Sequence, residues 1–484
     1  MTVDTISGSS QVTTPLCVDL DGTLINTDLL LESFVRVLKE SPWVLLFVPF
    51  WLLKGKHILK AELAARCHIN IEKLPYNEAL ISHLSTQQNL GRQLILCTGS
   101  NIKFALQINQ HLNLFDEVIA SDDMRNLTGS TKVKELNERF SSGGYDYAGN
   151  EAIDLKIWKD ARKALVINGS VSLKDKTEKL TEIDLFQEKP RVSLKLYLKA
   201  ARIHQWVKNL LIFVPLGTAH IVNSTDAYMA SILAFISFGL LASSTYIIND
   251  LTDLDSDRCH DKKRERPFAS GAISIQRGIL FSAGLLISGL SLTLVLPIEF
   301  GIVLMIYLIT TLSYSLRLKS MASVDVITLA LLYTVRVIAG AFAIGVTLSF
   351  WLLAFSLFIF LCLAIVKRVS ELINMEKQNK DKAMGRGYEV ADRSVLQSLG
   401  TSSGYMAVLV MALYINSTDV IKLYQTPEIL WILCPILLYW ITRVWMKTAR
   451  GLMNEDPILF ALKDKNSWMV GLLSGMAVVL ATIL

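Results

Sequence analysis

Long apolar runs fill the second half of this 484-residue chain and are nearly absent from the first half. Residues 1–190 mix charged and apolar side chains, whereas residues 203–484 consist mainly of apolar stretches about as long as a bilayer core is thick. Overall, 52% of the residues are hydrophobic, which is more than a soluble protein of this length usually carries. The sequence therefore predicts a soluble domain followed by an all-α polytopic membrane domain.

The apolar stretches predict about nine transmembrane helices. Lys and Arg gather in the loops after the even-numbered stretches, and the loops after the odd-numbered ones hold almost none. Because basic loops stay in the cytoplasm, we expect a multi-pass protein of the inner (cytoplasmic) membrane, with its N-terminal domain cytoplasmic and its C-terminus external. Residues 1–15 also lack the apolar core of a signal peptide. The predicted spans are 203–222, 228–248, 277–296, 299–316, 324–346, 349–367, 398–416, 428–446 and 468–484.

A cluster of carboxylates follows the second predicted span, in residues 249–258 (NDLTDLDSDR). Asp250, Asp253 and Asp257 are spaced i, i+3 and i+7, which would place them on one face of a continuous helix and leave Asp255 off that face. Such a face needs a cation, and Mg²⁺ is commonly shared between carboxylates and substrate phosphates. The cluster thus predicts a site for a Mg²⁺-bound diphosphate. A polar helix end at the membrane surface is the alternative.

Further charged and polar residues lie within or beside the predicted spans, where a charge is costly and marks a candidate site. Arg336 lies deep in the fifth span, where it could bind a substrate anion or pair with a carboxylate for packing alone. Taken singly, the others could anchor lipid headgroups, but together on the cytoplasmic side they favour an anion pocket around the metal-bound carboxylates. These candidates are Arg202, Gln205, Lys208, Asn209, Asn249, Arg258, Lys262, Arg266, Tyr314, Lys319, Asp325, Lys367, Arg368, Glu371, Arg386 and Tyr388.

The order of these motifs resembles the UbiA superfamily of intramembrane prenyltransferases, and within it the decaprenyl-phosphate phosphoribosyltransferase branch. The resemblance covers roughly residues 195–484 and rests on Asn249–Asp257, on Arg202–Asn209 (RIHQWVKN) and on the motifs around Arg336. Ordinary members carry a second Asp-rich motif (DxxxD) after a later helix, where this chain has only Asp325. That difference favours phosphoribosyl transfer over prenyl transfer.

The resemblance implies Mg²⁺-dependent transfer of a 5-phosphoribosyl group from 5-phosphoribosyl 1-diphosphate to a polyprenyl phosphate in the bilayer. It implies that Asp250, Asp253 and Asp257 hold Mg²⁺ on the diphosphate. Lys208 and Arg336 would position the lipid phosphate. The alternative is an enzyme that transfers a prenyl group from a polyprenyl diphosphate to an aromatic or other acceptor. No nucleic-acid partner is expected, and a homo-oligomer is left open.

The first half of the chain carries four ordered motifs of its own. Asp19 and Asp21 follow an apolar stretch, Thr98 ends a second one, and Lys132 and Asp154 come later. Their order resembles the HAD phosphatase superfamily. The resemblance implies that Asp19 is the nucleophile and Asp21 the general acid and base. Thr98 and Lys132 would bind the phosphate, with Lys134 as the alternative to Lys132, and the three aspartates would hold Mg²⁺.

The same resemblance implies the domain boundaries. An α/β, Rossmannoid domain with a parallel sheet is expected over residues 1–168, with a helical cap at roughly 28–92. Residues 169–190 are charged and poor in apolar side chains, so we expect a linker there, followed by a UbiA-like domain over residues 191–484. Asn150 stands where the HAD family has the first Asp of its last motif, so an inactive, regulatory domain is the alternative.

An apolar stretch, Trp43–Leu53, lies inside the expected cap and is too short to cross a bilayer. It could be buried in the cap or lie at the membrane interface. Since only a short connector joins the two halves, the phosphatase domain is expected to remove the 5-phosphate from the lipid-linked product of the membrane half. Six scattered cysteines predict neither a disulfide framework nor a zinc site.

Overall fold

The computed structural model describes residues 14–221, 223–378, 386–453 and 456–484. The chain divides into two compact units. One consists of Met1–Ala201 and Tyr246–Ala283, and the other of Arg202–Thr245 and Gly284–Leu484. The first unit therefore includes the predicted Asp-rich motif as well as the N-terminal part of the chain.

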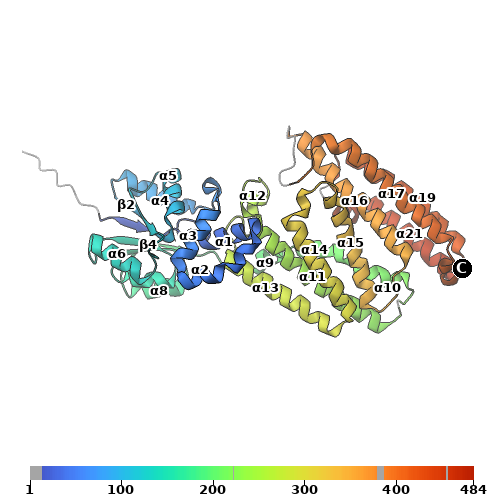
Figure 1. The fold of residues 1–484 in the computed structure, drawn as a ribbon, viewed down its shortest axis with the longest axis horizontal. Helices are drawn as coiled ribbons and strands as arrows, with labels where there is room; N and C mark the ends of the chain where they lie inside the picture. Colours follow the sequence, from blue (N-terminus) through green and yellow to red (C-terminus); the bar gives the residue numbers. More distant parts are fainter. Residues whose placement is uncertain (1–13, 222, 379–385, 454–455) are drawn as a thin grey trace, which may run out of the picture. The chain divides into compact units, whose positions relative to one another are not determined.

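A six-stranded sheet forms the centre of the first unit, with the strand order β3-β2-β1-β4-β5-β6. Figure 1 labels two of its strands, β2 and β4. All neighbouring strands are parallel, and Leu16 at the start of β1 lies opposite Leu94 and Asp146. The predicted parallel α/β domain is thus confirmed. The strands are β1 (Leu16–Val18), β2 (Leu94–Asn101), β3 (Glu117–Ser121), β4 (Asp146–Gly149), β5 (Lys163–Gly169) and β6 (Glu182–Glu188).

Alternate residues of the central strands pack into two separate apolar cores. Leu16 and Val18 belong to one core, and Cys17 between them belongs to the other, because successive side chains of a strand point to opposite faces. Helices therefore cover both faces, as buried parallel sheets require. The helices in this part of the chain are α1 (Leu29–Glu40), η1 (Pro42–Leu46), α2 (Val48–Lys54), α3 (Lys56–Arg66), η2 (Ile71–Lys73), α4 (Glu78–Asn89), α5 (Ile102–Leu112), α6 (Ser130–Phe140), η3 (Ala152–Asp154), α7 (Leu155–Trp158), α8 (Val171–Glu178) and α9 (Leu194–Ala200).

The expected linker, residues 169–190, is not a connector but contains α8 and β6. Strand β6 pairs with β5 at the edge of the sheet, and its side chains are exposed or half-buried. An edge strand buries little surface, so its sequence can remain polar and resemble a linker. The sheet therefore extends to Glu188, beyond the boundary expected at residue 168.

Eight helices in the described part of the chain are long and apolar enough to cross a membrane, one fewer than predicted. The first predicted span, 203–222, instead forms η4 (Ile203–Phe213) and α10 (Val214–Thr218). Pro215 begins a new helix there because it has no amide hydrogen to continue the preceding one. The eight helices are Thr225–Thr252, Ile275–Val295, Ile298–Leu316, Val324–Ala343, Phe350–Glu376, Val390–Ile415, Pro427–Ala449 and Lys465–Ile483.

Several of these segments include short 3-10 turns, and shorter helices lie between them. The elements are α11 (Thr225–Thr252), α12 (Leu254–Arg258), η5 (Lys263–Glu265), α13 (Ile275–Leu292), η6 (Thr293–Val295), α14 (Ile298–Leu316), η7 (Leu318–Ser320), α15 (Val324–Ala343), α16 (Phe350–Glu376), η8 (Val390–Asp392), α17 (Arg393–Ile415), α18 (Thr418–Leu423), η9 (Pro427–Ile432), α19 (Leu433–Ala449), α20 (Pro457–Lys463) and α21 (Lys465–Ile483).

A glycine at position 340 lets α15 approach η4 closely. A Cβ atom at Gly340 would lie 2.0 Å from the backbone oxygen of Ile212, and a backbone atom cannot move aside cheaply. We expect Gly340→Ala to lower the thermal unfolding midpoint of the detergent-solubilised protein strongly, because the two helices must separate. Gly284→Ala is the matched control, since its Cβ would meet nothing within 4 Å. Equal midpoints for the two variants would contradict this packing.

Candidate functional site

Asp19 and Lys132 form an ion pair at the carboxyl end of the central strand β1. The Lys132 ammonium lies 2.9 Å from Asp19 Oδ1 and also donates to the Cys97 carbonyl and the Tyr147 hydroxyl. Burial alone would lower the pKa of Lys132, but the Asp19 carboxylate raises it, so this lysine keeps its charge. Lys134, the alternative for this role, is exposed and pairs with Glu138. The structure therefore brings together the predicted carboxylate and one specific lysine.

Asp21 lies beside this pair and is held by two donors. Its Oδ1 accepts the backbone N–H of Leu29 at 3.0 Å, and its Oδ2 accepts the Ser100 hydroxyl. Burial, reinforced by the nearby Asp28 carboxylate, raises the pKa of Asp21 to about 7. A carboxyl group with this pKa can donate and accept a proton near neutral pH.

Asp154 is a third buried carboxylate of this cluster. Its Oδ2 accepts the backbone N–H groups of Asn150 and Glu151, each at 3.0 Å. Burial and the neighbouring Asp19 raise the pKa of Asp154 to about 6. Two buried carboxylates that repel each other are a chemically suitable oxygen pair for a divalent cation. Within the described ranges, no group of three or more His, Cys, Asp or Glu side chains is placed to hold a metal.

Asn150, which departs from the expected Asp, packs directly on the turn after Asp21. Gly22 has a φ of +74°, and a Cβ there would lie 2.2 Å from Asn150 Nδ2. Asn150 Oδ1 also accepts the Thr23 hydroxyl at 3.2 Å. The glycine is thus required both by its backbone conformation and by the close approach of Asn150.

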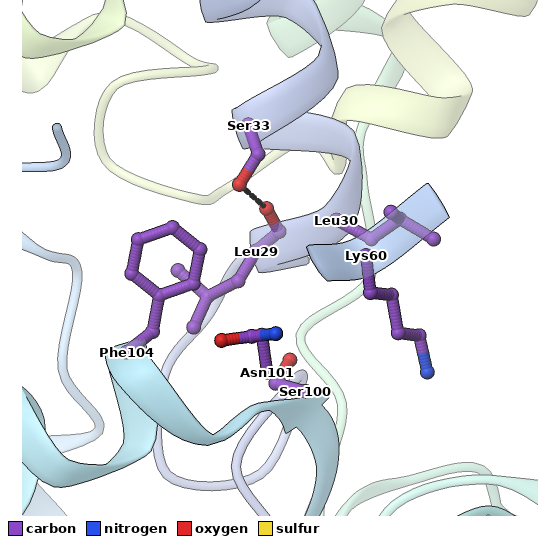
Figure 2. A pocket seen from close by; sticks show the side chains of 7 residues that line it. All are labelled: Leu29, Leu30, Ser33, Lys60, Ser100, Asn101 and Phe104. Carbon is purple, nitrogen blue, oxygen red and sulfur yellow. Dashed lines mark hydrogen bonds between the residues drawn. The ribbon is translucent and has the colours of Figure 1, made fainter. Parts of the chain in front are cut away.

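A small pocket opens at Leu29 and Ser100, the hydrogen-bond partners of Asp21, and none of its lining residues was predicted from the sequence. In Figure 2 the side chains of Leu29 and Phe104 lie on one side of the pocket and Lys60 on the other. The Lys60 ammonium donates to the Gly99 carbonyl at 2.6 Å and to Asn126 Oδ1 at 2.7 Å. The lining residues are Leu29, Leu30, Ser33, Lys60, Ser100, Asn101 and Phe104.

Thr98, predicted to bind phosphate, is fully buried and accepts the backbone N–H of Ser100 at 3.0 Å. This hydrogen bond lies within the irregular last part of β2, which also contains Ser100. Ser100 was not predicted, and its position two residues after Thr98, where the apolar stretch was expected to end, is the signal that could have found it.

The Asp-rich segment does not form the continuous helix that its spacing predicted. Helix α11 ends at Thr252, and Asp253, with φ −104° and ψ 14°, begins the short helix α12. Asp250 and Asp257 are nearly fully buried and meet at one guanidinium, with Arg266 Nη1 lying 3.1 Å from Asp250 and 2.6 Å from Asp257. Burial raises the pKa of Asp257, and Arg266 opposes this effect. These two carboxylates thus already converge on a cation.

Helix α1, from the N-terminal part of the chain, supplies cations to the other two aspartates of the segment. The Lys39 ammonium lies 2.5 Å from Asp253 Oδ1 and donates to the Thr252 carbonyl at 3.0 Å. Arg36 of the same helix pairs with Asp255. The Asp-rich segment is therefore held in part by residues more than 200 positions earlier in the chain.

Arg258, predicted to bind substrate, donates hydrogen bonds from all three guanidinium nitrogens to groups of the same unit. Its Nη1 and Nη2 donate to the Glu32 carboxylate at 2.5 and 3.1 Å, and its Nε donates to the Ala269 carbonyl at 3.1 Å. Both partners of this ion pair are 4% exposed. Arg258 therefore fixes the segment to α1, whereas the predicted Lys262 is exposed to solvent.

Replacing Glu32 should reveal the strength of this attachment. We expect Glu32→Gln to lower the free energy of unfolding by about 3 kcal/mol, because it leaves the Arg258 guanidinium buried without a counter-charge. Glu40→Gln removes an exposed carboxylate from the same helix, which pairs with Arg36, and should change stability by less than about 1 kcal/mol. Denaturant unfolding in detergent micelles measures both, and equal effects would contradict the buried pair.

In the second unit, Asp325 is surrounded by two arginines and a tyrosine. Arg368 Nη2 lies 2.9 Å from Asp325 Oδ1, Arg386 Nη1 lies 3.2 Å from the same oxygen, and the Tyr314 hydroxyl donates to it at 2.8 Å. Arg368 Nη1 also pairs with Glu371 at 2.6 Å. The predicted residues at the ends of α14 and α16 are thus assembled into one buried network.

Arg336 lies in the middle of α15 and is 4% exposed. Its Nε donates to Asn209 Oδ1 at 3.0 Å, and its guanidinium stacks near the Tyr307 and Phe238 rings at 5.1 and 5.2 Å. Among the described residues, no carboxylate contacts Arg336. The described part of the structure therefore does not contain the ion pair that was the alternative interpretation of this residue. Asn209 Nδ2 is buried and lacks a hydrogen-bond partner among the described side chains.

Lys208 pairs with Asp456, a residue that sequence reasoning did not single out. Burial alone would raise the pKa of Asp456, but Lys208 lowers it. Lys367 also interacts electrostatically with this pair. The other candidates of this unit are placed as follows: Tyr388 accepts the Ser323 N–H, Arg202 is a left-handed residue before η4, and Gln205, Lys319 and, in the first unit, Asn249 are half-buried.

Comparison with known proteins places these features in context. The model of the UbiA prenyltransferase family matches residues 210–462. The uncharacterized protein y4nM of Sinorhizobium fredii is 36% identical over 470 residues, covering 96% of this chain and 91% of that protein. The decaprenyl-phosphate phosphoribosyltransferase of Mycolicibacterium smegmatis is 32% identical over 226 residues, covering 46% of this chain and 70% of that enzyme.

A solved structure of a UbiA homolog from Archaeoglobus fulgidus, bound to DMAPP and Mg²⁺, overlaps 58% of this chain and 96% of that homolog. The overlap has a TM-score of 0.46 at 19% sequence identity.

Proposed function

The chain belongs to the UbiA prenyltransferase family, and from this premise we propose that its membrane half transfers a 5-phosphoribosyl group from 5-phosphoribosyl 1-diphosphate to a polyprenyl phosphate. The similarity to a decaprenyl-phosphate phosphoribosyltransferase supports this choice of substrates. Asp325, the lone carboxylate where ordinary members carry a second Asp-rich motif, pairs with Arg368 and Arg386.

The observation that carries the proposal is the buried Arg336. A guanidinium within a membrane helix is costly unless it is paired, and this one has only neutral partners among the described residues. The unpaired amide nitrogen of Asn209 lies beside it. Together they offer a positive charge and a free N–H group to an anion, and a phosphate group supplies the matching acceptors.

The proposed transfer breaks the bond between the anomeric carbon and the diphosphate and forms a bond from that carbon to an oxygen of the lipid phosphate. The lipid phosphate is already an anion, so it needs positioning rather than a base. Arg336, Asn209 and Lys208 would position it. Mg²⁺ held by Asp250, Asp253 and Asp257 would neutralise charge on the departing diphosphate. In the structure, Arg266 pairs with Asp250 and Asp257.

We propose that the α/β domain is a HAD-type phosphatase that removes the 5-phosphate from the lipid-linked product. Asp19 would attack the phosphorus while Asp21, whose pKa near 7 leaves it protonated part of the time, gives its proton to the departing 5-oxygen. Asp21 would then take a proton from the water that hydrolyses the aspartyl phosphate. Lys132 offsets the charge on Asp19, and Asp19 and Asp154 are the residues that would hold Mg²⁺.

The combined product would be polyprenyl-phosphoryl ribose, a lipid-borne sugar donor for envelope polysaccharides. Both sites would work on the cytoplasmic side of the inner membrane, where phosphorylated metabolites are found. The charge pattern of the loops supports this orientation.

A comparison of donors tests the transfer reaction. Purified protein with Mg²⁺ and polyprenyl phosphate should form a labelled lipid from labelled 5-phosphoribosyl 1-diphosphate, and Asp250→Asn should abolish it. Asp261→Asn, an exposed carboxylate of the same loop, is the control and should retain activity. Product formed only from isoprenyl diphosphates with an aromatic acceptor would instead favour the prenyltransferase alternative.

A further inference from the structure

A cluster of large apolar side chains lies exposed on the helical segment between β1 and β2. Trp43 is 77% exposed, Phe50 63% and Leu53 86%. The cluster, named here the apolar ridge, lies on η1, on α2 and on Phe47 between them, and consists of Trp43, Leu45, Leu46, Phe47, Phe50, Leu52 and Leu53. Soluble surfaces rarely expose so many large apolar residues together unless something binds them.

The opposite side of the same segment is apolar as well and is already packed. Val44 is 8% exposed, and Val48 and Trp51 contact the core beneath the sheet. Arg66 of α3 lies over the Trp51 ring at 4.9 Å. Packing in the domain core therefore explains the apolar side chains on only one side of this segment. The exposed side chains of the apolar ridge do not contribute to that core.

We propose that the apolar ridge inserts into the interface of the lipid bilayer. The unit that carries it also contains the end of α11 and the start of α13, both long and apolar enough to cross a membrane. Exposed Lys54 and Lys56 follow the ridge directly, which suits anionic headgroups. Aromatic side chains such as Trp43 and Phe50 favour the boundary between headgroups and acyl chains. The segment is too short to span, so it lies in the interface.

This placement also defines the substrate class of the neighbouring pocket, and that step rests on the proposed phosphatase. Helix α1 supplies Leu29, Leu30 and Ser33 to the pocket and α3 supplies Lys60, and these two helices flank the ridge in the chain (Figure 2). A pocket built on the same helices would face substrates at the membrane surface. Its substrate is then a phosphate monoester carried on a lipid.

A fluorescent label on single cysteines tests the insertion in the full chain. In a Cys259→Ser background, which removes the exposed native cysteine, Leu53→Cys carries an environment-sensitive dye. Leu90→Cys is the matched control, because Leu90 is 71% exposed but follows α4 and precedes the amino end of β2, outside the ridge. In vesicles of phosphatidylethanolamine and phosphatidylglycerol, brominated lipids should quench the dye at position 53 at least twofold more than at position 90. Equal quenching, or shielding at position 53 from aqueous iodide without lipid quenching, would overturn the proposal and indicate a protein partner or a second copy.

A kinetic test separates this proposal from the phosphatase itself. The double variant Phe47→Ser and Phe50→Ser should lower kcat/KM for the lipid-linked phosphate about tenfold or more, because two apolar anchors are lost. Hydrolysis of p-nitrophenyl phosphate in detergent should stay unchanged. Equal loss on both substrates would contradict the anchoring role. If the wild-type protein hydrolyses neither substrate, the proposed phosphatase activity is wrong. The lipid-quenching experiment would still test whether the apolar ridge inserts into the bilayer.

Discussion

Replacing Asp19 by asparagine is expected to halt the pathway at the phosphorylated lipid. Asn cannot attack phosphorus as a carboxylate does, so removal of the 5-phosphate should fall by about a thousandfold or more. Transfer of the phosphoribosyl group should continue, because none of the residues proposed for transfer lies in the sheet domain's Asp19–Lys132 cluster. Mass spectrometry of the lipid product should therefore find phosphoribose where the wild-type protein yields ribose.

Asp123→Asn is the control for this experiment, since Asp123 is an exposed carboxylate of the same domain. Its product should match that of the wild type. If Asp19→Asn still yields the dephosphorylated lipid, the α/β domain is not the phosphatase of this product. If transfer stops as well, the two activities are not separable in the way proposed.

Replacing Arg336 by glutamine is expected to abolish transfer while leaving the phosphatase intact. The variant keeps a hydrogen-bonding side chain but loses the buried positive charge, and loss of one preorganised charge contact typically costs a hundredfold to about a thousandfold in rate. Hydrolysis of p-nitrophenyl phosphate by the α/β domain should be unchanged. Arg336→Lys should recover part of the transfer rate, because it restores the charge without the planar geometry.

Arg317→Gln serves as the matched control, since Arg317 is exposed at the end of α14. It should transfer at the wild-type rate. Thermal unfolding of all three variants distinguishes a catalytic loss from misfolding. If Arg336→Gln transfers normally at an unchanged unfolding midpoint, the buried guanidinium has only a packing role.

The sheet domain could be predicted because local patterns determine it. Buried parallel strands are short apolar runs, and Asp19 follows directly on one of them, at the strand end where ligands bind in such sheets. The choice between Lys132 and Lys134 could not be made from the motif alone. Helix α6 decides it by turning Lys132 toward the sheet and Lys134 toward solvent.

The errors share a physical cause, which is that burial depends on distant parts of the chain. Strand β6 looked like a linker because an edge strand needs few apolar residues. The Asp-rich segment looked like one helical face because spacing alone cannot reveal that α11 ends at Thr252, just before Asp253, or that α1 provides Lys39. Arg258 looked like a substrate ligand because its partner, Glu32, lies 226 residues away in the sequence.

A donor labelled at two positions tests the central claim most directly. The donor is 5-phosphoribosyl 1-diphosphate with tritium in the ribose and radioactive phosphorus in the 5-phosphate. It is incubated with the purified full chain, Mg²⁺ and polyprenyl phosphate. The account predicts a lipid product that contains tritium and has lost the radioactive phosphorus, and it predicts that Asp19→Asn retains both labels in the lipid. A lipid fraction free of tritium would contradict the account.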